Sequence, residues 1–139
     1  MDDQLISNLI RLLLSCLCAF IIGVEREKEH KPAGLRTCIV LCFTMALLMI
    51  INEELVIFFK GNCDVLRLPA YCIMSIGFLG SGIIICHKGH VEGVTTACIL
   101  LLLVAIGVLC GINKIDLAFI STIFAYFILK LKHITKYIK

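Results

Sequence analysis

The stretch IGFLGSG, residues 76–82, lies in the middle of a long apolar run and carries three glycines. In water each glycine would weaken a helix by about 1 kcal/mol relative to alanine, and such a stretch would predict a turn. The rest of the chain argues against water as its solvent. Of 139 residues, 60% are hydrophobic and 17% charged, and the mean hydropathy is +1.05. Soluble domains average about 45–50% apolar and about 25% charged residues, so the sequence predicts an integral membrane protein.

The apolar residues fall into blocks that are each roughly long enough to cross a hydrocarbon core of about 30 Å. The blocks lack the alternation of barrel strands, and lipid offers no partner for unpaired backbone groups, so we expect helices. The predicted fold class is an all-α, polytopic helical membrane protein with about five transmembrane helices, forming a single domain over residues 1–139. The predicted spans are residues 5–24, 35–51, 66–86, 94–112 and 115–131, with a continuation of the second to residue 59 left open.

The basic residues predict the orientation of these spans, because cytoplasmic loops are enriched in lysine and arginine. Two loops, 25–36 and 87–93, would share one side with the C-terminal tail. The basic residues on that side are Arg26, Lys28, Lys31, Arg36, Lys88, Lys130, Lys132, Lys136 and Lys139. Those on the other side are Arg11, Lys60, Arg67 and Lys114. Nine against four places the first side in the cytoplasm, with the N-terminus outside and the C-terminus inside.

In lipid the glycine stretch has two possible uses. Small residues let a second helix approach closely, and Gly77 and Ser81 have the small-xxx-small spacing of such a crossing. The helix-packing motif would comprise Gly77, Gly80, Ser81 and Gly82. Alternatively, a locally unwound helix could turn its carbonyls towards a cavity, as in transporter binding sites. We expect the packing use, with a homo-oligomer formed through the third span.

The segment GVEREKEHKPAGLRT, residues 23–37, connects the first two spans. Glu25 and Arg26 come directly after the first span, and Arg36 and Thr37 open the second. A cation at a helix start is unfavourable beside the positive end of the helix dipole unless an acid is near. We therefore expect an ion pair between Glu25 and Arg36.

At the predicted outer side, Asp64 and Arg67 stand one helical turn apart where the third span begins. An exposed pair at this spacing contributes only about 0.2–0.5 kcal/mol. If the pair faces the bundle interior, it becomes a functional-site hypothesis. Arg11 would either extend its head to the interface or pair with Asp64.

The inner loop HKGHVEGVTTA leads into the fourth span. Thr95 or Thr96 could cap that helix, or its open amides could receive an anion or the carboxylate of Glu92. His87 and His90 would supply only two ligands, and we expect them to be solvated rather than metal-bound.

The nine cysteines include no CxxC pair and are odd in number, so neither a disulfide framework nor a zinc site is predicted. Most lie in apolar segments, where cysteine is a small apolar filler. Cys63 is the one expected in a loop. We also find no nucleophile–base spacing of an enzyme, and the dispersed basic residues do not predict nucleic-acid binding.

Four motifs in register carry a resemblance to a known family: GVEREKEHKPAGLRT, the D-x-x-R of residues 64–67, IGFLGSGII and VEGVTTA. Together they resemble the MgtC/SapB family of bacterial inner-membrane proteins over residues 8–128. The chain departs from the family at Cys38, where histidine is common. The longer members carry a C-terminal soluble domain, and we expect only the membrane domain here.

The resemblance implies a multi-pass protein of the cytoplasmic membrane, linked to magnesium limitation and, in pathogens, to survival inside host cells. Magnesium transport is the family's conventional label, with Mg²⁺ as substrate or ligand and no other cofactor. The alternative is a non-transporting regulator that binds other membrane complexes such as the F-type ATP synthase. No catalytic activity is implied. Asp64 and Glu25 are the metal-ligand candidates. The residues carried over as ion-path or buried ion-pair candidates are Glu25, Arg26, Arg36, Thr37, Asp64, Arg67, Thr95 and Thr96.

Overall fold

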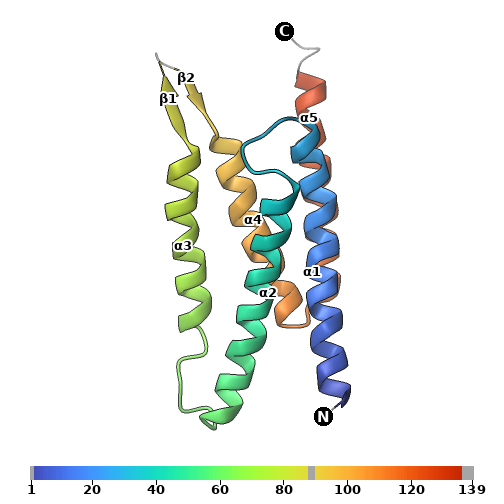
Figure 1. The fold of residues 1–139 in the computed structure, drawn as a ribbon, viewed down its shortest axis with the longest axis vertical. Coiled ribbons are helices and arrows are strands. Elements are labelled where there is room, and N and C mark those ends of the chain that lie inside the picture. Colours follow the sequence, from blue (N-terminus) through green and yellow to red (C-terminus); the bar gives the residue numbers. More distant parts are fainter. Residues whose placement is uncertain (1, 88–89, 136–139) are drawn as a thin grey trace.

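The structure, a computed structural model, describes residues 2–87 and 90–135. Its helices are α1 (Asp2–Lys28), α2 (Leu35–Phe58), α3 (Arg67–Ile83), α4 (Val94–Gly111) and α5 (Ile115–Thr135). A short antiparallel hairpin of β1 (Ile85–His87) and β2 (His90–Glu92) joins α3 to α4 (Figure 1). The predicted all-α membrane fold is confirmed, and the second helix does continue beyond residue 51.

By length and composition, three helical segments of the described chain are long and apolar enough to cross a membrane. They are Asp3–Lys28, Leu35–Phe58 and Val94–Gly111. The 17 residues of α3 rise only about 26 Å, slightly less than a hydrocarbon core of about 30 Å. That α3 and α5 also cross the membrane stays a prediction.

The predicted end of the third span, residue 86, is wrong. The helix ends at Ile83, and Ile84 takes an extended conformation with φ −81° and ψ 113°. The next residues pair with β2 in the register Ile85↔Glu92 and Cys86↔Val91, so the predicted loop 87–93 is partly a hairpin. The apolar pattern runs unbroken through this change because strand residues such as Ile85 are apolar too.

The helices α2 and α4 cross closely, and this crossing depends on two glycines of α4. A Cβ at Gly107 would lie 2.6 Å from the carbonyl oxygen of Cys42, and one at Gly111 would collide with Met49. Both glycines are buried. Their G-x-x-x-G spacing is the signal of close backbone approach in membrane helices, and the sequence analysis above missed it.

The helix α3 stands at the edge of the bundle (Figure 1). It packs mainly on α4 and touches α2 only slightly, whereas α5 packs on α1 and α4. One lateral face of α3 is therefore not covered by the part of the chain that the structure describes.

The α1–α2 turn, the hairpin and the last turns of α5 gather at one end of the bundle, which we call the hairpin end (Figure 1). The start of α1, the α2–α3 connection and the α4–α5 turn lie at the opposite end. This grouping agrees with the predicted two sides of the membrane, and the assignment of the hairpin end to the cytoplasm stays a prediction. Lys88, Lys136 and Lys139, which entered that prediction, lie outside the described residues.

Candidate polar site at the hairpin end

Arg26 is the buried charge of the hairpin end. It lies in the last turns of α1 and is only 3% exposed. Its Nη2 donates to the hydroxyl of Thr96 on α4 at 3.3 Å, and its Nη1 lies 3.7 Å from the Oε2 of Glu25. Its Nε has no hydrogen-bond partner among the described residues. The structure thus brings together three of the predicted site residues, Glu25, Arg26 and Thr96.

A cavity of about 460 Å³ opens beside Arg26, between the α1–α2 turn, the hairpin and the start of α4. Its volume falls in the range of about 300–1,000 Å³ typical of small-molecule sites. The lining residues are Arg26, His30, Lys31, Pro32, Ile83, Ile85, Val91, Glu92, Gly93, Thr95 and Thr96. The lining therefore combines polar side chains of the α1–α2 turn and the start of α4 with apolar side chains of α3 and the hairpin.

The prediction that Thr95 or Thr96 caps α4 is wrong. The helix begins at Val94, and the capping position is Gly93, which offers no side chain. Gly93 has φ +90°, and a Cβ there would collide with the carbonyl oxygen of Ile83. The chain can therefore pass so close to α3 only with glycine at this position.

The expected ion pair between Glu25 and Arg36 is absent among the described residues, since Glu25 instead lies beside Arg26. At the start of α2 the acid is Glu27, whose Oε2 accepts a hydrogen bond from the backbone N–H of Leu35 at 2.8 Å. Gly34 makes room for this contact, because a Cβ there would collide with Glu27. Glu27 was not among the predicted site residues, although the positive end of the α2 dipole favours a nearby acid.

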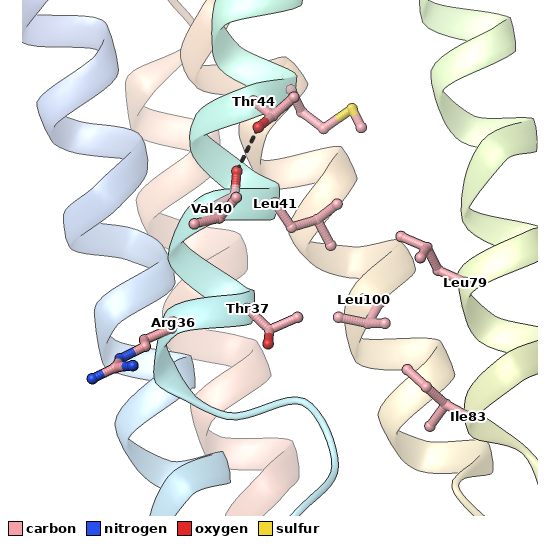
Figure 2. A pocket seen from close by; sticks show the side chains of 9 residues that line it. Arg36, Thr37, Val40, Leu41, Thr44, Leu79, Ile83 and Leu100 are labelled. Carbon is pink, nitrogen blue, oxygen red and sulfur yellow. Dashed lines mark hydrogen bonds between the residues drawn. The ribbon is translucent and has the colours of Figure 1, made fainter.

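Arg36 and Thr37 lie instead at the rim of a groove of about 580 Å³ between α2, α3 and α4 (Figure 2). The groove is lined mostly by apolar side chains such as Leu41 and Leu79, and the guanidinium of Arg36 points away from it (Figure 2). The hydroxyl of Thr44 already donates to the carbonyl of Val40 at 2.7 Å. Among its described residues the groove therefore offers no carboxylate, and few oxygen ligands of the kind that magnesium requires.

At the opposite end, Asp64 and Arg67 are both exposed and form no ion pair in the part of the chain that the structure describes. The Oδ1 of Asp64 accepts from the N–H of Leu66 at 3.1 Å, and Arg67 lies over the ring of Tyr71. Asp64 precedes α3, so its side chain stabilises the turn before the helix rather than a charge on the helix.

Arg11 pairs not with Asp64 but with Glu53 near the end of α2, at 2.6 Å. Its Nη1 also donates to the carbonyl of Gly111 at 3.2 Å, which ties α1 to both α2 and α4. Beside this pair, Gln4 donates to Glu54 at 3.1 Å. The sequence analysis missed these two acids because they sit in a polar segment that the predicted second span excluded.

The glycine stretch of α3 divides between two surfaces. Gly80 is buried, and a Cβ there would lie 3.4 Å from that of Ala97 on α4. Gly77 and Gly82 are exposed and would have nothing within 4 Å of an added Cβ. Ser81 is exposed and donates to the carbonyl of Phe78 at 2.8 Å. Because α3 stays helical as far as Ile83, the locally unwound alternative is wrong.

The described residues contain no group of three or more His, Cys, Asp or Glu side chains able to hold a metal ion. Asp64 and Glu25 belong to opposite ends of the bundle, so they cannot share one ion (Figure 1). Of the two histidines considered as ligands, His90 is exposed, and the side chain of His87 is not among those that the structure describes.

The nine cysteines are all free, and five of them are buried: Cys18, Cys38, Cys42, Cys72 and Cys110. This placement agrees with their predicted role as small apolar fillers. Cys63 lies half-buried in the α2–α3 connection, as expected for a loop position.

Comparison with known proteins identifies close relatives. The chain is similar to protein SapB of Bacillus subtilis, with 33% identity over 84% of this chain and 52% of the relative. It is 30% identical to the "Putative magnesium transporter YhiD" of Escherichia coli K12, over 90% of this chain and 60% of the relative. Protein MgtC of Brucella abortus is 36% identical over 75% of this chain and 42% of the relative.

The chain therefore spans about half the length of the curated relatives it matches. No solved structure shows significant similarity to it. The sequence profile of the MgtC family matches residues 12–137, which include all five helices apart from the first turns of α1. This match, together with relatives of 30–36% identity and a fold of long apolar helices, shows that the chain is a membrane protein that belongs to the MgtC family.

Proposed function

We propose that the chain serves magnesium homeostasis in a bacterial cytoplasmic membrane as a multi-pass regulatory protein, acting through contacts with other membrane proteins rather than by carrying Mg²⁺. The link to magnesium comes from its relative YhiD, whose name describes a magnesium transporter. The observation that carries the regulatory form of the proposal is the uncovered glycine face of α3. We define this α3 face as Met74, Gly77, Phe78, Ser81 and Gly82.

The α3 face has the properties of a helix-packing surface. Phe78 is 83% and Met74 72% exposed, and Gly77 and Gly82 leave open space where a backbone can approach. Without water to drive association, membrane helices pair through such close van der Waals packing at small residues. The first contact that we expect is with α3 of a second copy, because Gly77 and Ser81 have the spacing typical of self-associating helices.

The pairing of two carboxylates with arginines supports a structural role for these charges. Glu25 lies beside Arg26, and Glu53 beside Arg11. A carboxylate that already faces an arginine would attract a dication only weakly, since the cation repels it. Asp64, the candidate outer ligand, belongs to no group of three or more possible metal ligands in the described chain.

Transport is the second candidate, and the name of YhiD is what favours it. A path would have to lead from Asp64 past α3 to Glu25. The helical backbone of α3 uses its own carbonyls, as in the hydrogen bond from Ile84 N–H to the carbonyl of Gly80 at 3.2 Å. One copy of the chain thus offers few free oxygen ligands between the two ends.

Magnesium uptake into proteoliposomes separates these functions. We expect folded protein to give no flux above empty liposomes, with Asp64→Asn and Glu25→Gln equal to the wild type. A flux that falls in both variants would establish a carrier and overturn the regulatory proposal.

The contact itself is tested by placing the photo-cross-linker benzoylphenylalanine at Phe78, with the same probe at Phe124 of α5 as a control. Phe124 is also exposed, at 65%, but lies on another helix. We expect a specific adduct from Phe78 alone, lost when Gly77→Leu closes the α3 face. An adduct of two copies would identify self-association, and a larger one a different membrane protein. No adduct from Phe78, or one that survives Gly77→Leu, would contradict the proposal.

A further inference from the structure

We propose that the cavity at the hairpin end binds a phosphate-type oxyanion between Arg26, Lys31 and the first backbone amides of α4. The inference rests on the geometry of this end of the bundle and is independent of whether the chain carries magnesium.

The guanidinium of Arg26 is nearly enclosed yet incompletely bonded. It has five N–H donors in a fixed fork. One of them reaches Thr96, Nη1 lies at the long distance of 3.7 Å from Glu25, and Nε has no partner in the part of the chain that is described. A buried arginine with donors left over is costly unless an anion completes it. Arg26 lines the cavity, which places a site for that anion next to it.

The start of α4 supplies a second set of donors to the same cavity. The first internal hydrogen bond of the helix runs from Ala97 N–H to the carbonyl of Gly93, at 2.9 Å. The N–H groups of Val94, Thr95 and Thr96 come before it and have no acceptor within the helix. No side chain caps them, because Gly93 occupies the capping position. Such amides, at the positive end of the dipole, bind phosphate and carboxylate groups.

The charges around the cavity favour an anion over a cation. Among the described residues that line the cavity are two cations, Arg26 and Lys31, and one acid, Glu92, while the Nδ1 of His30 already lies 3.3 Å from the carbonyl oxygen of Glu27. Glu25, the partner of Arg26, lines a different cavity between α1 and α5. Phosphate suits this arrangement because an arginine fork binds two of its oxygens at once.

Two sources can present this chemistry: a free phosphate compound in the cytoplasm or the headgroup of an anionic lipid. Beside the polar residues, the apolar Ile83, Ile85 and Val91 also line the cavity. An anionic lipid would pack its acyl chains against these apolar side chains, whereas a free anion would leave them uncovered.

The test measures two probes on the full chain. Inorganic phosphate is titrated calorimetrically into protein in a neutral detergent, and phosphatidylglycerol retained from mixed phosphatidylcholine nanodiscs is counted by native mass spectrometry. The variants are Lys31→Gln, Arg26→Gln and Glu92→Gln, and Lys28→Gln is the control. Lys28 is an exposed lysine of the same end that does not line this cavity.

We expect Lys31→Gln to weaken binding of the probe about two- to fivefold. Arg26→Gln should weaken binding at least about tenfold. Glu92→Gln should tighten binding of the probe, and Lys28→Gln should leave binding unchanged. Binding of inorganic phosphate with this ranking assigns the free anion, and the ranking for phosphatidylglycerol alone assigns the headgroup. Failure of both probes to bind, or equal effects of Lys31→Gln and Lys28→Gln, would overturn the site. Lys31 lies in the turn, so this comparison holds even if Arg26→Gln does not fold.

Discussion

At the residue scale, Arg11 shows how a charge is accommodated near the opposite end of the bundle. Its side chain is 12% exposed, and that of its partner Glu53 is 47% exposed. A hydrogen bond to a charged group contributes about 1.5–3 kcal/mol when protected, and the exposure of Glu53 reduces this to about 1 kcal/mol. We expect Glu53→Gln to lower the free energy of unfolding by about this amount.

Thermal unfolding in detergent measures this loss, with Glu54→Gln as the matched control. Glu54 is the adjacent acid and bonds only the neutral Gln4 near the exposed start of α1. Equal shifts in the two variants would mean that the pair of Arg11 and Glu53 has no special role.

Residue types could be predicted at this scale, but their partners could not. The sequence places Glu25 at the end of the first helix and Arg36 at the start of the second, as the structure does. Arg11 and Glu53 stand 42 positions apart, so their meeting depends on how α1 and α2 pack. The predicted ion pair between Glu25 and Arg36 is wrong for the same reason. The carboxylate that reaches the start of α2 is that of Glu27.

A second prediction at the residue scale concerns Glu27. Its carboxylate accepts the N–H of Leu35 as a capping side chain would, and removal of a cap costs about 0.5–2 kcal/mol. We expect Glu27→Ala to lose stability in this range, while Glu27→Gln keeps much of it because an amide oxygen can also accept. Unfolding by denaturant compares the two, and equal losses would argue against a capping role.

At the scale of elements, the α2–α4 crossing leaves no room for an added side chain. A Cβ at Gly107 would meet the backbone of Cys42, which cannot rotate away as a side chain can. Overpacking of this kind costs about 1–3 kcal/mol. We therefore expect Gly107→Ala to destabilise the bundle by about that much.

The matched control is Gly82→Ala in α3, where nothing lies within 4 Å of the new Cβ. Since alanine is the better helix former, this variant should be neutral or slightly stabilising. Both glycines lie inside helices, so the comparison isolates packing. A loss in Gly82→Ala as large as in Gly107→Ala would contradict the assignment of the tight crossing to α2 and α4.

The two glycine motifs also show what a pattern leaves undecided. IGFLGSG attracts attention by the density of its glycines, yet two of them face outward, while the less conspicuous Gly107 and Gly111 make the close crossing. Glycines spaced four residues apart indicate a helix face that another backbone can approach closely. Which helix meets that face depends on the arrangement of the whole bundle.

At the scale of the whole molecule, the number and order of the helices could be predicted because lipid leaves an apolar chain few alternatives. The hairpin after α3 could not, since the apolar content of residues 85–87 suits a helix end and a strand equally well. The grouping of loops into two ends followed from the alternation of five predicted spans, and charge was needed only to predict which end is cytoplasmic. That grouping leads to the last prediction, the orientation of the bundle.

Two native cysteines can report the orientation. Cys63 lies in the α2–α3 connection at the predicted outer end, and Cys86 is exposed in β1 at the hairpin end. A membrane-impermeant maleimide should modify Cys63 in intact spheroplasts, and Cys86 only after permeabilisation, because cytoplasmic loops carry the basic residues. Peptide mass mapping locates the label, and Cys63→Ser and Cys86→Ser verify each signal. Labelling of Cys86 but not Cys63 in intact spheroplasts would reverse the orientation and place the Arg26 cavity outside the cell.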